Sequence, residues 1–189
     1  MPRITLAAAL ACLALPTAAA DWTLSTDAST LGFVTIKNGD TAEAHSLSGL
    51  SGTVAEDGTA AVDIPLVNVE TYIDIRNERM RDILFAAVPT ATVTAQIDLD
   101  ALADLAPGAR RTQELEVTLA ANGQEVDYFT DVTITRVADD MVAVSTARPL
   151  IADARDLGYE GGVEELREIA GLDSISPAVP VSFDLMFSR

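Results

Sequence analysis

The chain has 189 residues, of which 49% are hydrophobic and only 5% aromatic, so it is long enough for one domain with a substantial core. Its 29 acidic residues outnumber its 12 basic ones, and the formal net charge of −17 disfavours binding to nucleic acid or to anionic membrane surfaces. Cys12 is the only cysteine, which excludes an internal disulfide.

The N-terminal segment has the pattern of a secretory signal peptide. Arg3 precedes an apolar run at residues 4–15, which is too short to span a membrane, and the small residues Ala18, Ala19 and Ala20 follow. A lipoprotein signal cut before Cys12 is the weaker alternative, because that cysteine lies inside the apolar run. Cleavage after Ala20 would separate a signal peptide, residues 1–20, from an exported domain, residues 21–189, and we expect that domain in the periplasm.

Apolar and polar residues alternate with period two through most of the remaining chain, as in half-buried strands. The clearest runs are at residues 91–99, 115–121, 126–134 and 179–187. Asn122-Gly123 is a strong hairpin signal because both residues tolerate positive φ, and turns are also expected at Asp57-Gly58 and Asp139-Asp140.

Three segments interrupt this pattern and predict short helices. They are residues 75–85, residues 101–106, and residues 163–170, the last of which is expected to begin after Gly161-Gly162. Many strands joined by hairpins predict a barrel or a sandwich, and about eight strands close a barrel that either packs solid or holds one small ligand. The small inward residues and the scarcity of aromatic side chains favour a hollow interior.

The sequence offers little for catalysis, and we predict no enzymatic activity and no cofactor. His45 is the single histidine, it lies outside any nucleophile motif, and we interpret it as a surface residue in a polar loop. No metal site is expected, because a zinc site needs several His or Cys ligands.

Arg76, Arg79 and Arg81 form the only dense group of basic residues. The simpler interpretation is a helix surface with local salt bridges, such as one between Arg79 and Asp82 at i,i+3 spacing. The alternative is that Arg76 and Arg79 meet the polar headgroup of a ligand at the mouth of a barrel.

A family resemblance centres on the same segment. Residues 69–85, VETYIDIRNERMRDILF, resemble the signature of the YceI-like lipid- and polyisoprenoid-binding family. In that signature a strand ending in Val-x-Thr leads to an Arg-Asp or Arg-Asn pair and then to a helix with Leu-Arg and a Phe. Further stretches resembling that family are Trp22-Thr23-Leu24 with residues 29–33, Leu157-Gly158-Tyr159 with Leu166-Arg167, and residues 179–183. Residues 46–50, SLSGL, depart from the family pattern.

The resemblance implies an all-β protein: an extended, lipocalin-like, antiparallel β-barrel of eight strands with short helices, which holds a long isoprenoid, quinone-like or other lipid. The expected function is therefore a periplasmic binding or carrier protein, without stable membrane insertion; the alternative is a non-enzymatic envelope stress or interaction module with a packed barrel. Strand parity predicts these ligand-facing residues: Phe33, Ile64, Leu66, Val93, Ile97, Leu115, Val117, Leu119, Val132, Ile134, Val144, Phe183 and Leu185.

Overall fold

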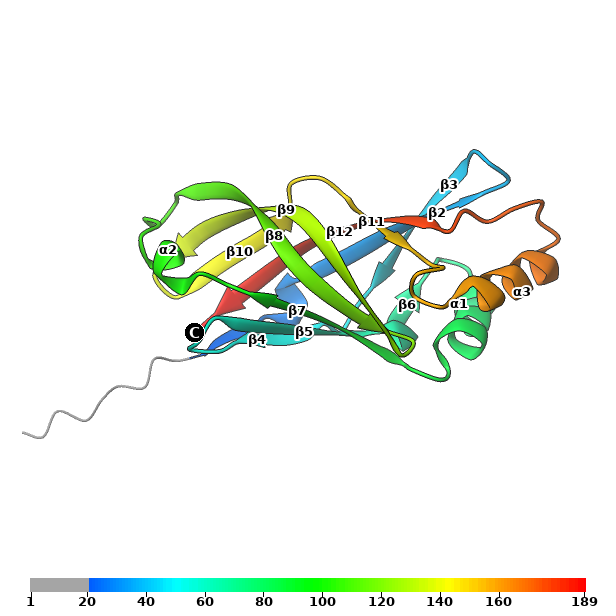
Figure 1. Ribbon diagram of the computed structural model, residues 1–189, viewed down its shortest axis with the longest axis horizontal. Helices are drawn as coiled ribbons and strands as arrows, with labels where there is room; N and C mark the ends of the chain where they lie inside the picture. The colour runs from blue at the N-terminus through cyan, green and yellow to red at the C-terminus, as the bar shows by residue number, and fades with distance from the viewer. Residues whose placement is uncertain (1–20) are drawn as a thin grey trace, which may run out of the picture.

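The computed structural model describes residues 21–189, so the expected signal peptide lies outside the described residues. One twisted antiparallel sheet closes on itself as a barrel, and helices gather at its two ends (Figure 1). The strands are β1 (Trp22–Leu24), β2 (Thr30–Lys37), β3 (Thr41–Leu47), β4 (Ser51–Val54), β5 (Thr59–Pro65), β6 (Val69–Glu70), β7 (Thr90–Gln96), β8 (Arg110–Ala121), β9 (Gln124–Ala138), β10 (Met141–Thr146), β11 (Leu150–Asp153) and β12 (Ala178–Ser188).

The barrel closes because the last strand pairs with the first. β1 joins the C-terminal end of β12 through Thr23 opposite Ser188, and the ladder then runs β1-β4-β5-β7-β8-β9-β10-β12. Farther along β12, β2 and β11 take the places of β1 and β10 as its neighbours. The predicted eight-stranded antiparallel barrel is confirmed.

The turns follow from residues that tolerate positive φ. Asn122 (φ 50°) and Gly123 (φ 77°) join β8 to β9, the longest hairpin of the fold. Gly58 (φ 85°) joins β4 to β5, where a Cβ atom would stand 2.2 Å from the carbonyl oxygen of Ile97. Glycine is therefore required at position 58 both by the backbone angle and by the closeness of β7.

The helices lie near the three predicted segments. They are α1 (Asp74–Met80), continued by the π-helical turn η3 (Arg81–Phe85), α2 (Leu99–Ala103) and α3 (Glu160–Ala170); η1 (Thr26–Ala28) and η2 (Leu66–Asn68) are short 3₁₀ turns. Asp98 caps α2 by accepting a hydrogen bond from the Ala101 N–H. Among the residues from Asp21 onward, no helix is long and apolar enough to cross a membrane.

The predicted start of the third helix was wrong. α3 begins at Glu160 and contains Gly161 and Gly162 in its first turn. A Cβ atom on Gly162 would lie 2.6 Å from Leu84 Cδ2, so the absent side chain lets α3 pack closely on η3. Gly162 serves this close approach, and the glycine pair does not mark the helix start.

Candidate functional site

A long apolar cavity occupies the inside of the barrel. Its volume is about 180 Å³, slightly larger than the roughly 150 Å³ apolar cavities that stay dry and bind benzene. Along β8 it extends from Arg111 to Leu119, about 26 Å at the usual rise of a strand. A small volume spread over that length makes a narrow channel, which suits a linear chain better than a compact ring system.

Eleven of the thirteen predicted ligand-facing residues line this cavity. They are Ile64, Val93, Ile97, Leu115, Val117, Leu119, Val132, Ile134, Val144, Phe183 and Leu185. Leu66 is buried in the core but not on the cavity wall, and Phe33 packs against the core and stacks in a tilted arrangement on His45. Their role in binding a ligand stays a prediction.

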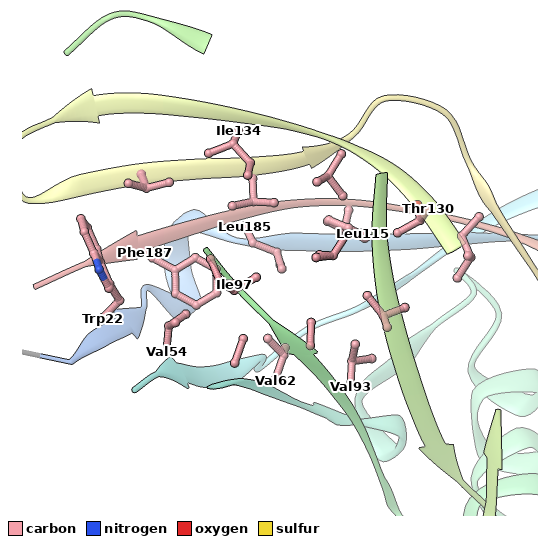
Figure 2. Close-up of a pocket in the computed structure, with 18 of the residues that line it drawn as sticks. Trp22, Val54, Val62, Val93, Ile97, Leu115, Thr130, Ile134, Leu185 and Phe187 are labelled. Carbon is pink, nitrogen blue, oxygen red and sulfur yellow. The ribbon is translucent and has the colours of Figure 1, made fainter. Parts of the chain in front are cut away.

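Trp22 lies at one end of the labelled cavity side chains and Thr130 at the other (Figure 2). Two arginines lie over the Trp22 ring: Arg136, with its guanidinium carbon 5.9 Å from the ring centroid, and Arg189, at 4.6 Å. Arg136 is buried and donates hydrogen bonds to the carbonyl oxygens of Leu102, Ala138 and Asp139. Arg136 therefore links α2 to the β9–β10 turn at this end of the barrel.

The barrel wall between β7 and β8 is paired over only part of the length of these strands. Their ladder pairs only Thr92–Ala95 with Val117–Ala120, and the two strands part beyond it toward α2. A surface hollow of about 540 Å³ lies there and shares Ala95, Asp98 and Leu115 with the inner cavity. The hollow therefore borders the inner cavity at these three residues, and we refer to it as the lateral opening.

Arg111 is the single basic residue on the cavity wall within residues 21–189, and it is not among the residues predicted to face a ligand. Its Nε is buried and has no hydrogen-bond partner among the described residues, and no ion pair there involves its guanidinium. A signal for it existed, because the parity of Leu115, Val117 and Leu119 extends back along β8 through Gln113 to Arg111. The alternation of apolar and polar residues is lost at Gln113, so the sequence pattern alone does not indicate that Arg111 faces inward.

The two arginines predicted to meet a headgroup do not line the cavity. Arg76 Nη1 lies 2.6 Å from Glu43 Oε2, and its Nη2 donates to the carbonyl oxygen of Thr71 at 2.7 Å. The expected ion pair between Arg79 and Asp82 is not among those formed in residues 21–189.

The signature segment forms a buried hydrogen-bond network between β6 and α1. Thr71 donates from its backbone N–H and its hydroxyl to Asn77 Oδ1, at 2.8 and 2.6 Å, while Asn77 Nδ2 donates to Glu70. Both Thr71 and Asn77 are buried, and Arg76 extends this network to β3 through Glu43. Within the described structure the polar residues of the signature thus hold strands and helix together, away from the cavity.

The interpretation of His45 as a surface loop residue was wrong. It lies in β3, is 4% exposed, and its Nε2 is 2.8 Å from Thr35 Oγ1. Burial lowers the pKa of His45, and the positive charge of Arg76 lowers it further, so the ring is held neutral. The error arose because polar neighbours in sequence, such as Ser46, do not report that the alternate residues of β3 face inward.

The described residues contain no cluster of three or more His, Cys, Asp or Glu side chains arranged to hold a metal ion. No catalytic pair of nucleophile and base lines the cavity within residues 21–189 either, since its polar side chains are those of Asp98, Arg111 and Thr130.

Several solved structures are similar to this chain, among them the following two, whereas no family model and no curated protein matches it. A polyisoprenoid binding domain from Saccharophagus degradans, implicated in plant cell wall breakdown, is 38% identical with a TM-score of 0.86, over 89% of this chain and 98% of that one. BcnA of Burkholderia cenocepacia has the same fold at 13% identity, with a TM-score of 0.65 over 86% of this chain and 98% of that one. At this identity and coverage the first similarity identifies the family: the chain belongs to the YceI-like lipid- and polyisoprenoid-binding family.

Proposed function

We propose that this protein binds a lipid with a linear isoprenoid or alkyl chain inside its barrel and carries it through the periplasm without chemical change. The observation that carries the proposal is the narrow apolar cavity inside a closed barrel. The similar domain from Saccharophagus degradans, described as polyisoprenoid binding, supports the ligand class. The signal-like N-terminal sequence supports export.

The free energy of burying apolar groups favours a ligand with a linear hydrocarbon chain. Each buried CH₂ group contributes about 0.8 kcal/mol, so one isoprene unit contributes roughly 3–4 kcal/mol before the entropy cost of binding. The enclosed volume of about 180 Å³ is that of about one or two isoprene units, judged from the cavity that holds benzene. A longer chain therefore has to extend through the lateral opening or to widen the channel by moving side chains.

The alternative of an interaction module with a solid barrel is not favoured, because the barrel interior is hollow. Solvent extraction of the purified protein followed by mass spectrometry tests the proposal directly. We expect a prenyl or long-chain lipid in the extract, and an extract free of lipid would count against a carrier role.

Binding can also be measured without a label. Trp22 is the only tryptophan and lines the cavity, so its fluorescence should change when a prenol enters. Val93→Phe narrows the channel and should weaken prenol binding by about tenfold, the equivalent of displacing two methylene groups. Val137→Phe is the matched control, because Val137 is exposed on the outer face of β9. Equal affinity of both variants would place the binding site outside the barrel.

Export is tested separately. Cell fractionation of the full-length chain should recover a product that begins at Asp21 in the periplasmic fraction, and a cytoplasmic product retaining residues 1–20 would overturn this part of the proposal.

A further inference from the structure

Arg111 combines three properties that the other cavity-lining residues do not share. It bears a permanent positive charge, it lies on the wall of an otherwise apolar channel, and its buried Nε donor has no acceptor within residues 21–189. A buried donor without an acceptor costs free energy, so folded proteins seldom keep one unless something else uses it. The position therefore favours a ligand atom that accepts a hydrogen bond.

Arg111 also lies next to the lateral opening. On β8 it has the same parity as Gln113 and Leu115, which line the hollow between β7 and β8, and it pairs across the ladder with Ile134 of β9. A lipid chain lying in the channel would have its polar end near this opening, where the polar end can keep contact with water. The other cavity-lining residue with an unpartnered polar atom is Thr130, which carries no charge and is opposite Leu115 in the ladder.

The charges around the opening select among possible headgroups. Asp98, Glu114 and Glu116 line the outer hollow, and no basic residue lines it within the described chain. An anionic head such as a phosphate would meet these carboxylates on its way to Arg111, whereas a hydroxyl or carbonyl oxygen would not be repelled. The acidic rim therefore favours an uncharged acceptor.

From this geometry we infer that Arg111 is a headgroup-binding residue: it donates to the uncharged oxygen, hydroxyl or carbonyl, of a lipid whose chain fills the barrel and whose head lies at the β7–β8 opening. This inference rests on the proposed function and adds the chemical class of the head and the orientation of the ligand. Arg76 has no part in it, because it does not line the cavity and both of its Nη atoms are paired, with Glu43 and with the Thr71 carbonyl oxygen.

The test uses three probes that share one isoprenoid chain: geranylgeraniol, its phosphate, and the corresponding hydrocarbon. Binding of each to the full mature chain is followed by Trp22 fluorescence. Arg111→Met keeps the unbranched stem but removes the donors. Arg110→Met is the matched control, because Arg110 is the adjacent residue of β8 and is exposed.

We expect wild type to bind the alcohol about tenfold more tightly than the hydrocarbon, the range of one hydrogen bond from a charged donor. Arg111→Met should remove that preference, so that it binds the alcohol and the hydrocarbon with similar affinity, while Arg110→Met keeps the wild-type preference. The phosphate should bind more weakly than the alcohol to wild type. Thr130→Val should preserve the preference for the alcohol.

Equal binding of alcohol and hydrocarbon to wild type would overturn the role of Arg111 while leaving lipid binding intact. Tighter binding of the phosphate, lost in Arg111→Met, would overturn the assignment to an uncharged head. Failure of all three probes to bind wild type would overturn the proposed function itself, and this inference with it. The comparison of probes on wild type decides the question even if Arg111→Met does not fold.

Discussion

The guanidinium of Arg76 joins α1 to β3 through a 2.6 Å ion pair with Glu43, which is 33 positions earlier in the chain. Lys37 contacts the same Glu43 carboxylate at 3.0 Å. Together Lys37 and Arg76 hold the pKa of Glu43 below its ordinary value, so this carboxylate is ionised at neutral pH. The relationship makes Arg76 a structural residue of the signature segment.

Arg76→Gln should lower the free energy of unfolding by about 1–3 kcal/mol, because it removes a half-exposed ion pair and a charged hydrogen bond to the Thr71 carbonyl. Chemical denaturation measures this change. Arg79→Gln is the control, since no hydrogen bond or ion pair of Arg79 is found in the described structure, and it should change stability by less than about 0.5 kcal/mol. Unchanged stability together with weaker lipid binding in Arg76→Gln would instead support the headgroup role that the sequence suggested.

Protonation of His45 should make the protein less stable in mild acid. Its folded-state pKa is lowered by burial, while in the unfolded chain it is about 6.5. As the pH falls below about 6.5, the unfolded chain binds a proton that the folded protein resists, so stability decreases until the folded-state pKa is reached. Well above pH 6.5 the ring is neutral in both the folded and the unfolded state, so His45 contributes nothing to the pH dependence of stability there. Denaturation curves between pH 8 and pH 5 should show this slope.

His45→Gln should flatten the slope between pH 6.5 and pH 5, although losing the ring contact with Phe33 lowers stability at every pH by about 1 kcal/mol. Glu43 titrates at lower pH because its pKa is depressed, so it does not confound this window. An identical slope in the variant would mean that other groups cause the pH dependence.

The two hairpin glycines should differ in their tolerance of alanine. Both have positive φ, 85° at Gly58 and 77° at Gly123, so either substitution costs about 1–2 kcal/mol of backbone strain. At Gly123 nothing lies within 4 Å of the new methyl group, whereas at Gly58 it meets the Ile97 carbonyl oxygen. Gly58→Ala should therefore destabilise the fold by about 1–3 kcal/mol more than Gly123→Ala, measured by thermal or urea unfolding. Equal losses would show that β7 moves away without cost.

Removal of the Tyr159 hydroxyl should be neutral or stabilising. The hydroxyl is buried and has no partner among residues 21–189, and burial raises the pKa of Tyr159 to about 12. Its ring packs edge to face on Phe85, with centroids 5.9 Å apart. Tyr159→Phe keeps that contact and should raise the free energy of unfolding by up to about 1 kcal/mol. Tyr159→Ala, the control, should lower it by about 3 kcal/mol. A loss in Tyr159→Phe would reveal an acceptor for the hydroxyl.

The alternation of apolar and polar residues determined the all-β class, the main strands and the inward face of each. A strand repeats every two residues, so parity assigns a face without reference to any other part of the chain. Turn residues such as Asn122 and Gly123 act just as locally, through their own backbone angles. These features were therefore predictable from sequence.

The contacts that each inward-facing residue makes were not predictable from the sequence, because they depend on the tertiary structure. The partner of Arg76, the burial of His45 and the unpaired donor of Arg111 depend on contacts with elements other than the one that carries each residue. Burial and hydrogen bonding are properties of such contacts, and one-dimensional periodicity does not encode them. For the same reason, the opening between β7 and β8 follows from where their ladder ends, which is fixed by the path of the chain into α2.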